Sequence, residues 1–85
     1  MKRYIKASTE KPELDWVSVK WQELGDGTGI VFAVISKDSE LLFEELFDYD
    51  DVDPDAIHDS AVDLAITVLS QKYTLTDEVI AELQK

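Results

Sequence analysis

A segment of thirty-four residues between Lys37 and Lys72 contains eleven acidic side chains and no lysine or arginine. The rest of the chain carries eight acids and eight bases, so the formal net charge of −11 arises in this segment. Disordered acidic tails are poor in aromatic and β-branched residues, whereas this segment interleaves its charges with Leu41, Leu42, Phe43, Leu46, Phe47 and Tyr49. Any fold of this chain must therefore pack these apolar side chains while it keeps the carboxylates at the surface.

The length of 85 residues predicts one domain, residues 1–85, with a small core. A hydrophobic content of 45% indicates that this domain folds. The chain has no cysteine and one histidine, which removes disulfides, thiolate nucleophiles and zinc–thiolate sites. We therefore expect no metal and no cofactor.

The chain begins with a positively charged stretch, residues 1–6, but no apolar segment typical of a secretion signal follows it. The longest apolar run, residues 30–35, is far shorter than a membrane span. These features predict a soluble cytoplasmic protein.

The first half of the chain has the pattern of β-structure. Residues 3–8 are expected to form a short strand, and a polar connector follows over residues 9–14. Residues 16–21 alternate, which predicts a half-buried strand with one apolar side. The side chains on that side are Val17, Val19 and Trp21.

All three glycines of the chain lie within residues 25–29. A short segment that tolerates positive φ between two β-rich runs predicts a hairpin loop. The following run, residues 30–36, is apolar at nearly every position, which predicts a central strand covered on its main face. Residues 37–39 are expected to form the next turn.

Residues 40–47 are compatible with two structures. A strand would place Leu41, Phe43 and Phe47 on one side, with Glu45 as the exception, and a helix would group Leu42, Phe43, Leu46 and Phe47. We favour the strand, because a short turn after a strong strand usually returns the chain antiparallel.

A long helix is expected from Pro54 to Tyr73, because Asp53 can cap the free amides and proline suits the first helical position. A second cap within residues 74–77 predicts a short terminal helix with Val79, Ile80 and Leu83 on its apolar side. The long helix has an apolar stripe formed by Ile57, Ala61, Val62, Leu64, Ala65, Ile66, Val68, Leu69 and Tyr73. The predicted fold class is α+β, an antiparallel β-meander of three or four strands packed against one long helix and a short C-terminal helix.

Three motifs are typical of metal-binding, catalytic or phosphate-binding sites, but none of them matches the full pattern of such a site. If Asp51, Asp53 and Asp55 were the first ligands of a calcium-binding EF-hand loop, its required glycine would be Ala56 and its final glutamate Val62. His58 lies among acids without a nucleophile in register, so we expect a surface histidine. The glycine-rich loop lacks the lysine and the helix of a phosphate-binding loop. We therefore expect that the protein is not an enzyme.

The acidic segment is the remaining candidate for a binding surface. Acids two residues apart on an extended chain, or four apart on a helix, are about 6 Å to 6.6 Å apart. This spacing is similar to the spacing of phosphates along a nucleic-acid strand. Trp16 and Trp21 fall on opposite faces of their strand, and an exposed Trp16 would be a second contact point. The expected partner-binding residues are Glu44, Glu45, Asp48, Asp50, Asp51, Asp53, Asp55, Asp59, Asp63 and Trp16.

The charge also determines which partners the protein attracts. Nucleic acids and anionic membranes repel it, so we expect neither to bind directly. We expect a basic protein surface as the partner. One such surface is a nucleic-acid-binding site, which the protein would block by mimicking phosphate charge, as small phage-borne inhibitors do. The alternative is a structural or assembly subunit, a homo-oligomer that self-associates through a sheet edge or the exposed tryptophan.

Overall fold

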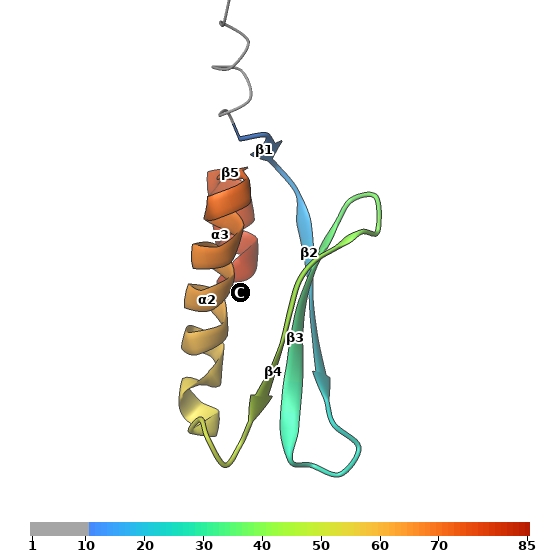
Figure 1. The fold of residues 1–85 in the computed structure, drawn as a ribbon, viewed down its shortest axis with the longest axis vertical. Helices are drawn as coiled ribbons and strands as arrows, with labels where there is room; N and C mark the ends of the chain where they lie inside the picture. Colours follow the sequence, from blue (N-terminus) through green and yellow to red (C-terminus); the bar gives the residue numbers. More distant parts are fainter. Residues whose placement is uncertain (1–10) are drawn as a thin grey trace, which may run out of the picture.

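The computed structural model describes residues 11–85 and has an α+β fold. Its main sheet has three antiparallel strands in the order β2-β3-β4, each joined to the next by a short turn (Figure 1). The predicted fold class is confirmed, the strand favoured for residues 40–47 is present at residues 41–48, and the strand expected at residues 3–8 lies outside the described residues. The strands are β2 (Val17–Glu23), β3 (Gly29–Ser36) and β4 (Leu41–Asp48).

The β2–β3 hairpin forms where the glycines predict it. Gly27 has a φ of 74°, in the region that favours glycine. The loop closes with a hydrogen bond from the Leu24 amide to the Gly29 carbonyl at 2.9 Å. The following strand, β3, lies between β2 and β4, which confirms its predicted central position.

A β-bulge changes which leucine of β4 faces the core. Val34 pairs with Phe43 but Ile35 pairs with Leu41, so Leu42 is the extra residue. The bulge turns Leu42 towards the core, where it is half-buried, and leaves Leu41 53% exposed on the other face. The prediction that Leu41 shares a side with Phe43 and Phe47 is therefore wrong.

Both helices begin at the predicted caps. The Asp53 carboxylate accepts a hydrogen bond from the Asp55 amide at 3.0 Å, and the first turn is a 3-10 helix. The Thr76 hydroxyl accepts one from the Val79 amide at 3.3 Å. No helix within residues 11–85 is long and apolar enough to cross a membrane. The helical segments are η1 (Pro54–Ala56), α2 (Ile57–Lys72) and α3 (Asp77–Leu83).

The two helices cover one face of the sheet, with α2 packed beside β4 and α3 beside β2 (Figure 1). Leu64 is 37% exposed on the outer side of α2, so its assignment to the apolar stripe is wrong. The side chains of the core are Leu14, Val17, Phe32, Val34, Phe43, Phe47, Ile57, Ala61, Val62, Ala65, Leu69, Val79 and Leu83.

A second, two-stranded sheet joins the chain before β2 to the chain after α2. It consists of β1 (Glu13–Leu14) and β5 (Thr74–Leu75), which pair in parallel. The Thr74 amide donates to the Pro12 carbonyl at 2.9 Å, and the buried Leu14 side chain joins the core. Part of the connector expected over residues 9–14 is therefore a short strand.

Candidate functional site

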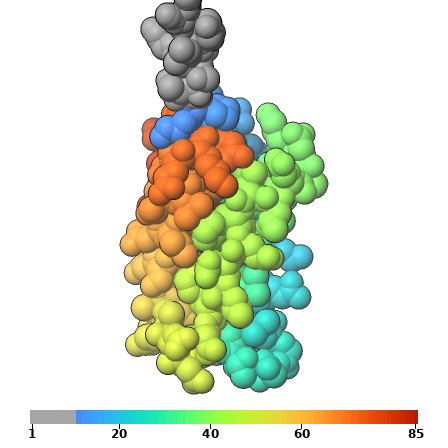
Figure 2. Space-filling view, viewed as in Figure 1, coloured from blue at the N-terminus to red at the C-terminus, as the bar shows by residue number. Residues whose placement is uncertain are grey.

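The acids gather at one end of the molecule, where the β2–β3 loop and the β4–α2 connection lie side by side. Gly29 pairs with Asp48, and the Tyr49 amide donates to the Thr28 carbonyl at 3.0 Å. In Figure 2 these two segments, teal and yellow-green, form the lower end of the molecule. We call this region the acidic end and define it by its exposed carboxylates, Glu23, Asp26, Asp48, Asp50, Asp51, Asp53, Asp55 and Asp59.

Three of these carboxylates accept hydrogen bonds from their own loops. Asp48 accepts from the Asp50 amide at 2.8 Å, and Asp26 accepts from the Thr28 hydroxyl at 2.7 Å and from the Thr28 amide at 3.1 Å. The hydroxyl bond is the main reason that the pKa of Asp26 is held below its ordinary value. Each bond uses Oδ1, as does the Asp53 cap, so Oδ2 can accept a donor from a partner.

The acidic end contains no compensating base in the described part of the chain. No lysine or arginine occurs between Trp21 and Ser36 or between Asp38 and Gln71. Within residues 11–85, the lysine ion pairs involve acids outside this set, Lys37 with Asp15 at 3.8 Å and Lys85 with Glu82 at 2.9 Å. The negative charge at this end is therefore available to an outside partner.

An aromatic pocket of about 290 Å³ opens beside the acidic end. Trp21 lines it, and its indole stacks on the His58 ring with centroids 5.8 Å apart and packs on Phe32 at 4.5 Å. The Tyr49 hydroxyl donates to the Glu23 carboxylate at 3.0 Å, and this hydrogen bond raises the pKa of Tyr49. The lining residues are Trp21, Ile30, Tyr49, Pro54, Ile57 and His58.

The His58 side chain is 44% exposed, as expected of a surface histidine, and it also lines this pocket. Its Nε2 donates to the Lys85 backbone oxygen at 2.8 Å, because a backbone oxygen can only accept. Its Nδ1 lies 3.7 Å from the Asp59 carboxylate. These contacts fix the imidazole as one wall of the pocket. Within residues 11–85, no three histidine or acidic side chains are grouped to hold a metal ion.

The ten predicted partner-binding residues do not form one surface. The loop aspartates and Asp59 belong to the acidic end, and Asp63 lies one turn further along α2, exposed. Glu44 and Glu45 are exposed on opposite faces of β4, because side chains alternate along a strand. Glu44 faces away from the helices, opposite Ala33 of the central strand.

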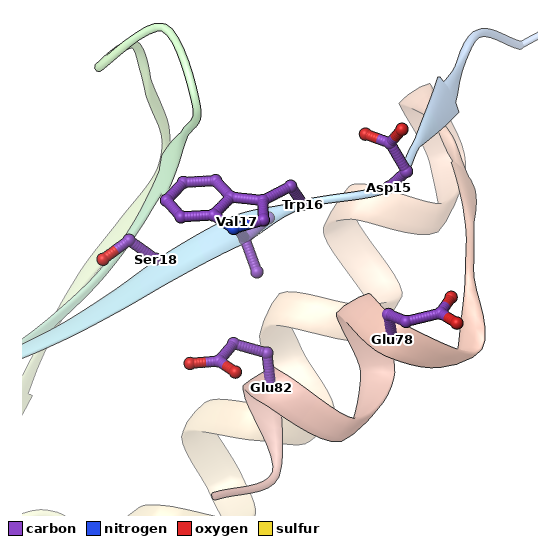
Figure 3. A pocket seen from close by; sticks show the side chains of 6 residues that line it. All are labelled: Asp15, Trp16, Val17, Ser18, Glu78 and Glu82. Atoms are coloured by element: carbon purple, nitrogen blue, oxygen red, sulfur yellow. The ribbon is translucent and has the colours of Figure 1, made fainter.

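Trp16 is 50% exposed, as predicted, but it lies at the other end of β2 from the acidic end. Figure 3 shows its indole on the opposite side of the strand from Val17 and α3. It borders a shallow hollow of about 190 Å³, whose other lining residues are Asp15, Val17, Ser18, Glu78 and Glu82. Trp16 and the acidic end therefore cannot contact the same small partner group.

The structure adds Glu23, Asp26 and the aromatic pocket, which the sequence reasoning missed. The signal for the two acids was the predicted antiparallel return of the chain after residues 30–36, because pairing of β3 with β4 brings the loop at residues 24–28 beside the chain that follows Asp48. The pocket had no such signal, since it depends on how α2 packs on β2. No family model, curated protein or solved structure matches this chain.

Proposed function

We propose that this protein is a non-enzymatic binding protein whose acidic end takes a basic protein surface. The observation that supports this most directly is the cluster of eight exposed carboxylates at the acidic end. They come from the β2–β3 hairpin, the β4–α2 connection and the start of α2. They lie without a lysine or arginine partner in the described part of the chain. Charges of one sign gathered in this way accelerate the approach of an oppositely charged partner.

The aromatic pocket gives this surface more than charge. Exposed ion pairs are each worth only about 0–1 kcal/mol, so a carboxylate surface alone binds weakly. A partner arginine or lysine can lay its apolar stem in the pocket and place its cation over the Tyr49 ring, among the carboxylates. The proposed complex therefore has one anchored basic side chain surrounded by rim contacts.

The partner we propose is a nucleic-acid-binding protein, whose groove of lysines and arginines the acidic end occupies as an inhibitor. Asp59 and Asp63 are one helical turn apart on α2, about 6 Å, and the aspartates of the β4–α2 connection precede them in the chain. This spacing is similar to that of phosphates along a nucleic-acid strand. Small inhibitors carried by phages or other mobile elements act in this way, and duplex DNA should compete with the protein for its partner.

The test is capture of heparin-binding host proteins by the immobilised protein at low and high salt. The triple variant Asp51→Lys, Asp55→Lys, Asp59→Lys should lose capture while its circular dichroism spectrum stays that of the folded protein. Capture by the unchanged protein should fall steeply between about 50 mM and about 500 mM salt, because a Debye length shrinks from about 14 Å to about 4 Å.

A matched control changes the net charge equally at the other end of the molecule. Glu13→Lys, Asp38→Lys, Glu40→Lys alters three exposed acids of β1 and the β3–β4 turn. This control should retain capture. Equal capture by the acidic-end variant would overturn the proposal, and equal loss in both variants would show that net charge, and not the acidic end, governs binding.

A further inference from the structure

The face of the sheet that points away from the helices is unusually apolar. We call it the outer face. An antiparallel sheet with one solvated face normally places polar residues there, but the central strand contributes Val31, Ala33 and Ile35. Leu41 and Leu46 of β4 flank them, and each is 53% exposed. The residues of the outer face are Ser18, Lys20, Gln22, Val31, Ala33, Ile35, Leu41, Glu44 and Leu46.

No element within residues 11–85 covers the outer face. Both helices lie on the opposite side of the sheet (Figure 1), where they pack on Phe32, Val34 and Phe43. Burying the exposed part of a leucine side chain contributes roughly 25 cal/mol for each Å² removed from water. A contiguous apolar surface on so small a protein marks an interaction site.

The outer face has an ordered charge pattern. Cross-strand pairing arranges its side chains in three rows, each running from β2 through β3 to β4. In the middle row Lys20 and Glu44 flank Ala33, so opposite charges lie on either side of the smallest side chain. Each of the two rows beside it has a polar residue on β2 and a leucine on β4. One row is Ser18, Ile35 and Leu41, and the other is Gln22, Val31 and Leu46.

We propose that the outer face binds a second copy of this chain, about a two-fold axis that runs parallel to β3. This rotation places β2 of one copy over β4 of the other, so Lys20 meets Glu44 of the partner subunit and the reciprocal pair forms as well. A two-fold axis across the strands would instead place each lysine on a lysine and each glutamate on a glutamate. Complementary charge therefore selects the axis along β3.

The same rotation also matches the side chains by size. Two sheets packed face to face lie about 10 Å apart, and Ala33 at the centre leaves room for the Val31 and Ile35 side chains to meet their counterparts. Leu41 and Leu46 then cover Ser18 and Gln22 of the partner subunit. A face of three strands measures about 14 Å by 23 Å, or about 320 Å² on each copy. This is smaller than the roughly 800 Å² per partner of standard stable interfaces, so the dimer is a weak, transient one. The expected dimer is reversible, with a dissociation constant in the micromolar range.

This inference does not rest on the proposed function, because the loops of the acidic end lie outside the outer face. The first test is sedimentation equilibrium of the full chain from about 1 μM to about 1 mM, a range that brackets micromolar dissociation. Leu46→Ser should raise the dissociation constant at least about tenfold. Leu64→Ser, which changes an exposed leucine on the outer side of α2, should leave it within about twofold.

The second test uses the charged row, whose exposed side chains can be changed without disturbing the core. Lys20→Glu and Glu44→Lys should each raise the dissociation constant about tenfold, and the double swap should restore it, because the pairs re-form with exchanged signs. A protein that remains monomeric at about 1 mM would overturn the inference, as would a dimer insensitive to Leu46→Ser. A double swap no better than the single changes would overturn the axis along β3.

Discussion

Gly29 shows how closely two backbones approach at the point where the acidic end is assembled. It pairs with Asp48 at the start of β3, and a Cβ atom placed on it would lie 2.6 Å from the Phe47 carbonyl oxygen. That distance is shorter than real Cβ contacts, and the clashing atom belongs to the backbone. Only glycine therefore fits at this residue without a shift of β4.

Gly29→Ala is expected to lower the free energy of unfolding by about 1–3 kcal/mol, the usual cost of overpacking. Gly25 is the matched control, because nothing lies within 4 Å of a Cβ added there and its φ is not in the positive region. Gly25→Ala should be neutral or stabilising by up to about 1 kcal/mol. Urea unfolding followed by circular dichroism measures both, and an equal effect of the two changes would contradict the close approach.

The hydrogen bond between Tyr49 and Glu23 makes stability depend on alkaline pH. Because it raises the pKa of Tyr49 above the unfolded value of about 10, the folded state holds the phenol proton more tightly. Its stabilising contribution is complete below pH 10 and is lost as the pH rises through the folded pKa. Tyr49→Phe should flatten this alkaline loss in thermal melts.

Glu23→Gln is the second variant for this hydrogen bond. It keeps an acceptor for the phenol but removes the negative charge, so the Tyr49 phenol should titrate at a lower pH than in the unchanged protein. Tyrosinate absorbance measures the shift. An unchanged titration would show that the carboxylate does not act on the phenol.

At the scale of single residues, the sequence predicted what depends on neighbours along the chain. The caps at Asp53 and Thr76 involve amides two or three residues away, so their side chains identified them. Leu41 was misplaced, and the contacts of His58 were not foreseen, because the surroundings of both come from distant segments. His58 is held by Trp21 and Lys85, and Leu41 is turned outward by a bulge against β3.

At the scale of elements, α2 contributes many of the core side chains. It contains one buried and one exposed leucine, which can be compared directly. Leu69 is fully buried, whereas Leu64 is 37% exposed. Leu69→Ala should lower the free energy of unfolding by about 2–5 kcal/mol, through lost burial and the cavity that remains. Leu64→Ala should cost less than about 1 kcal/mol. Urea unfolding compares them, and a larger cost at Leu64 would mean that the assigned helix face is wrong.

The approximate extent of the longer elements followed from periodicity, but the exact face of each did not. Alternation gave β2 correctly, since Val17, Val19 and Trp21 all turn towards the core. In α2 the apolar stripe was drawn too broadly, because an apolar residue at the rim of a helix can remain exposed. The short strands β1 and β5 escaped prediction, since two residues carry no period and their pairing joins opposite ends of the chain.

At the scale of the whole molecule, the net charge of −11 opposes the compact state. Sodium chloride should therefore raise the melting temperature, and a gain of about 1 kcal/mol corresponds to about 4–8 °C for a chain of this size. The acidic-end variant Asp51→Lys, Asp55→Lys, Asp59→Lys should respond less, because it carries less net charge. Calorimetry at about 20 mM and about 500 mM salt measures this. A melting temperature that falls with salt would show that attractive pairs dominate.

Only part of the acidic end could be predicted from the sequence. The base-free segment after Lys37 supplied Asp48 to Asp59, because their charges are adjacent in the chain. Glu23 and Asp26 belong to a different segment and join through the antiparallel register. Trp16, which was predicted to bind the partner together with the acids, lies at the opposite end of β2 from them.

The parallel pairing of β1 with β5 also affects the order in which the parts of the molecule fold. It joins residues about sixty positions apart, Glu13 with Thr74, so a long loop must be ordered before these two strands can meet. The β2–β3–β4 meander needs only short loops, and contacts between near neighbours in sequence generally form faster. Amide hydrogen exchange should be quickest in β1 and β5, through openings that leave the meander paired. We therefore expect the pairing of Gly29 with Asp48, which joins the β2–β3 loop to the β4–α2 connection, to form before β1 and β5 meet.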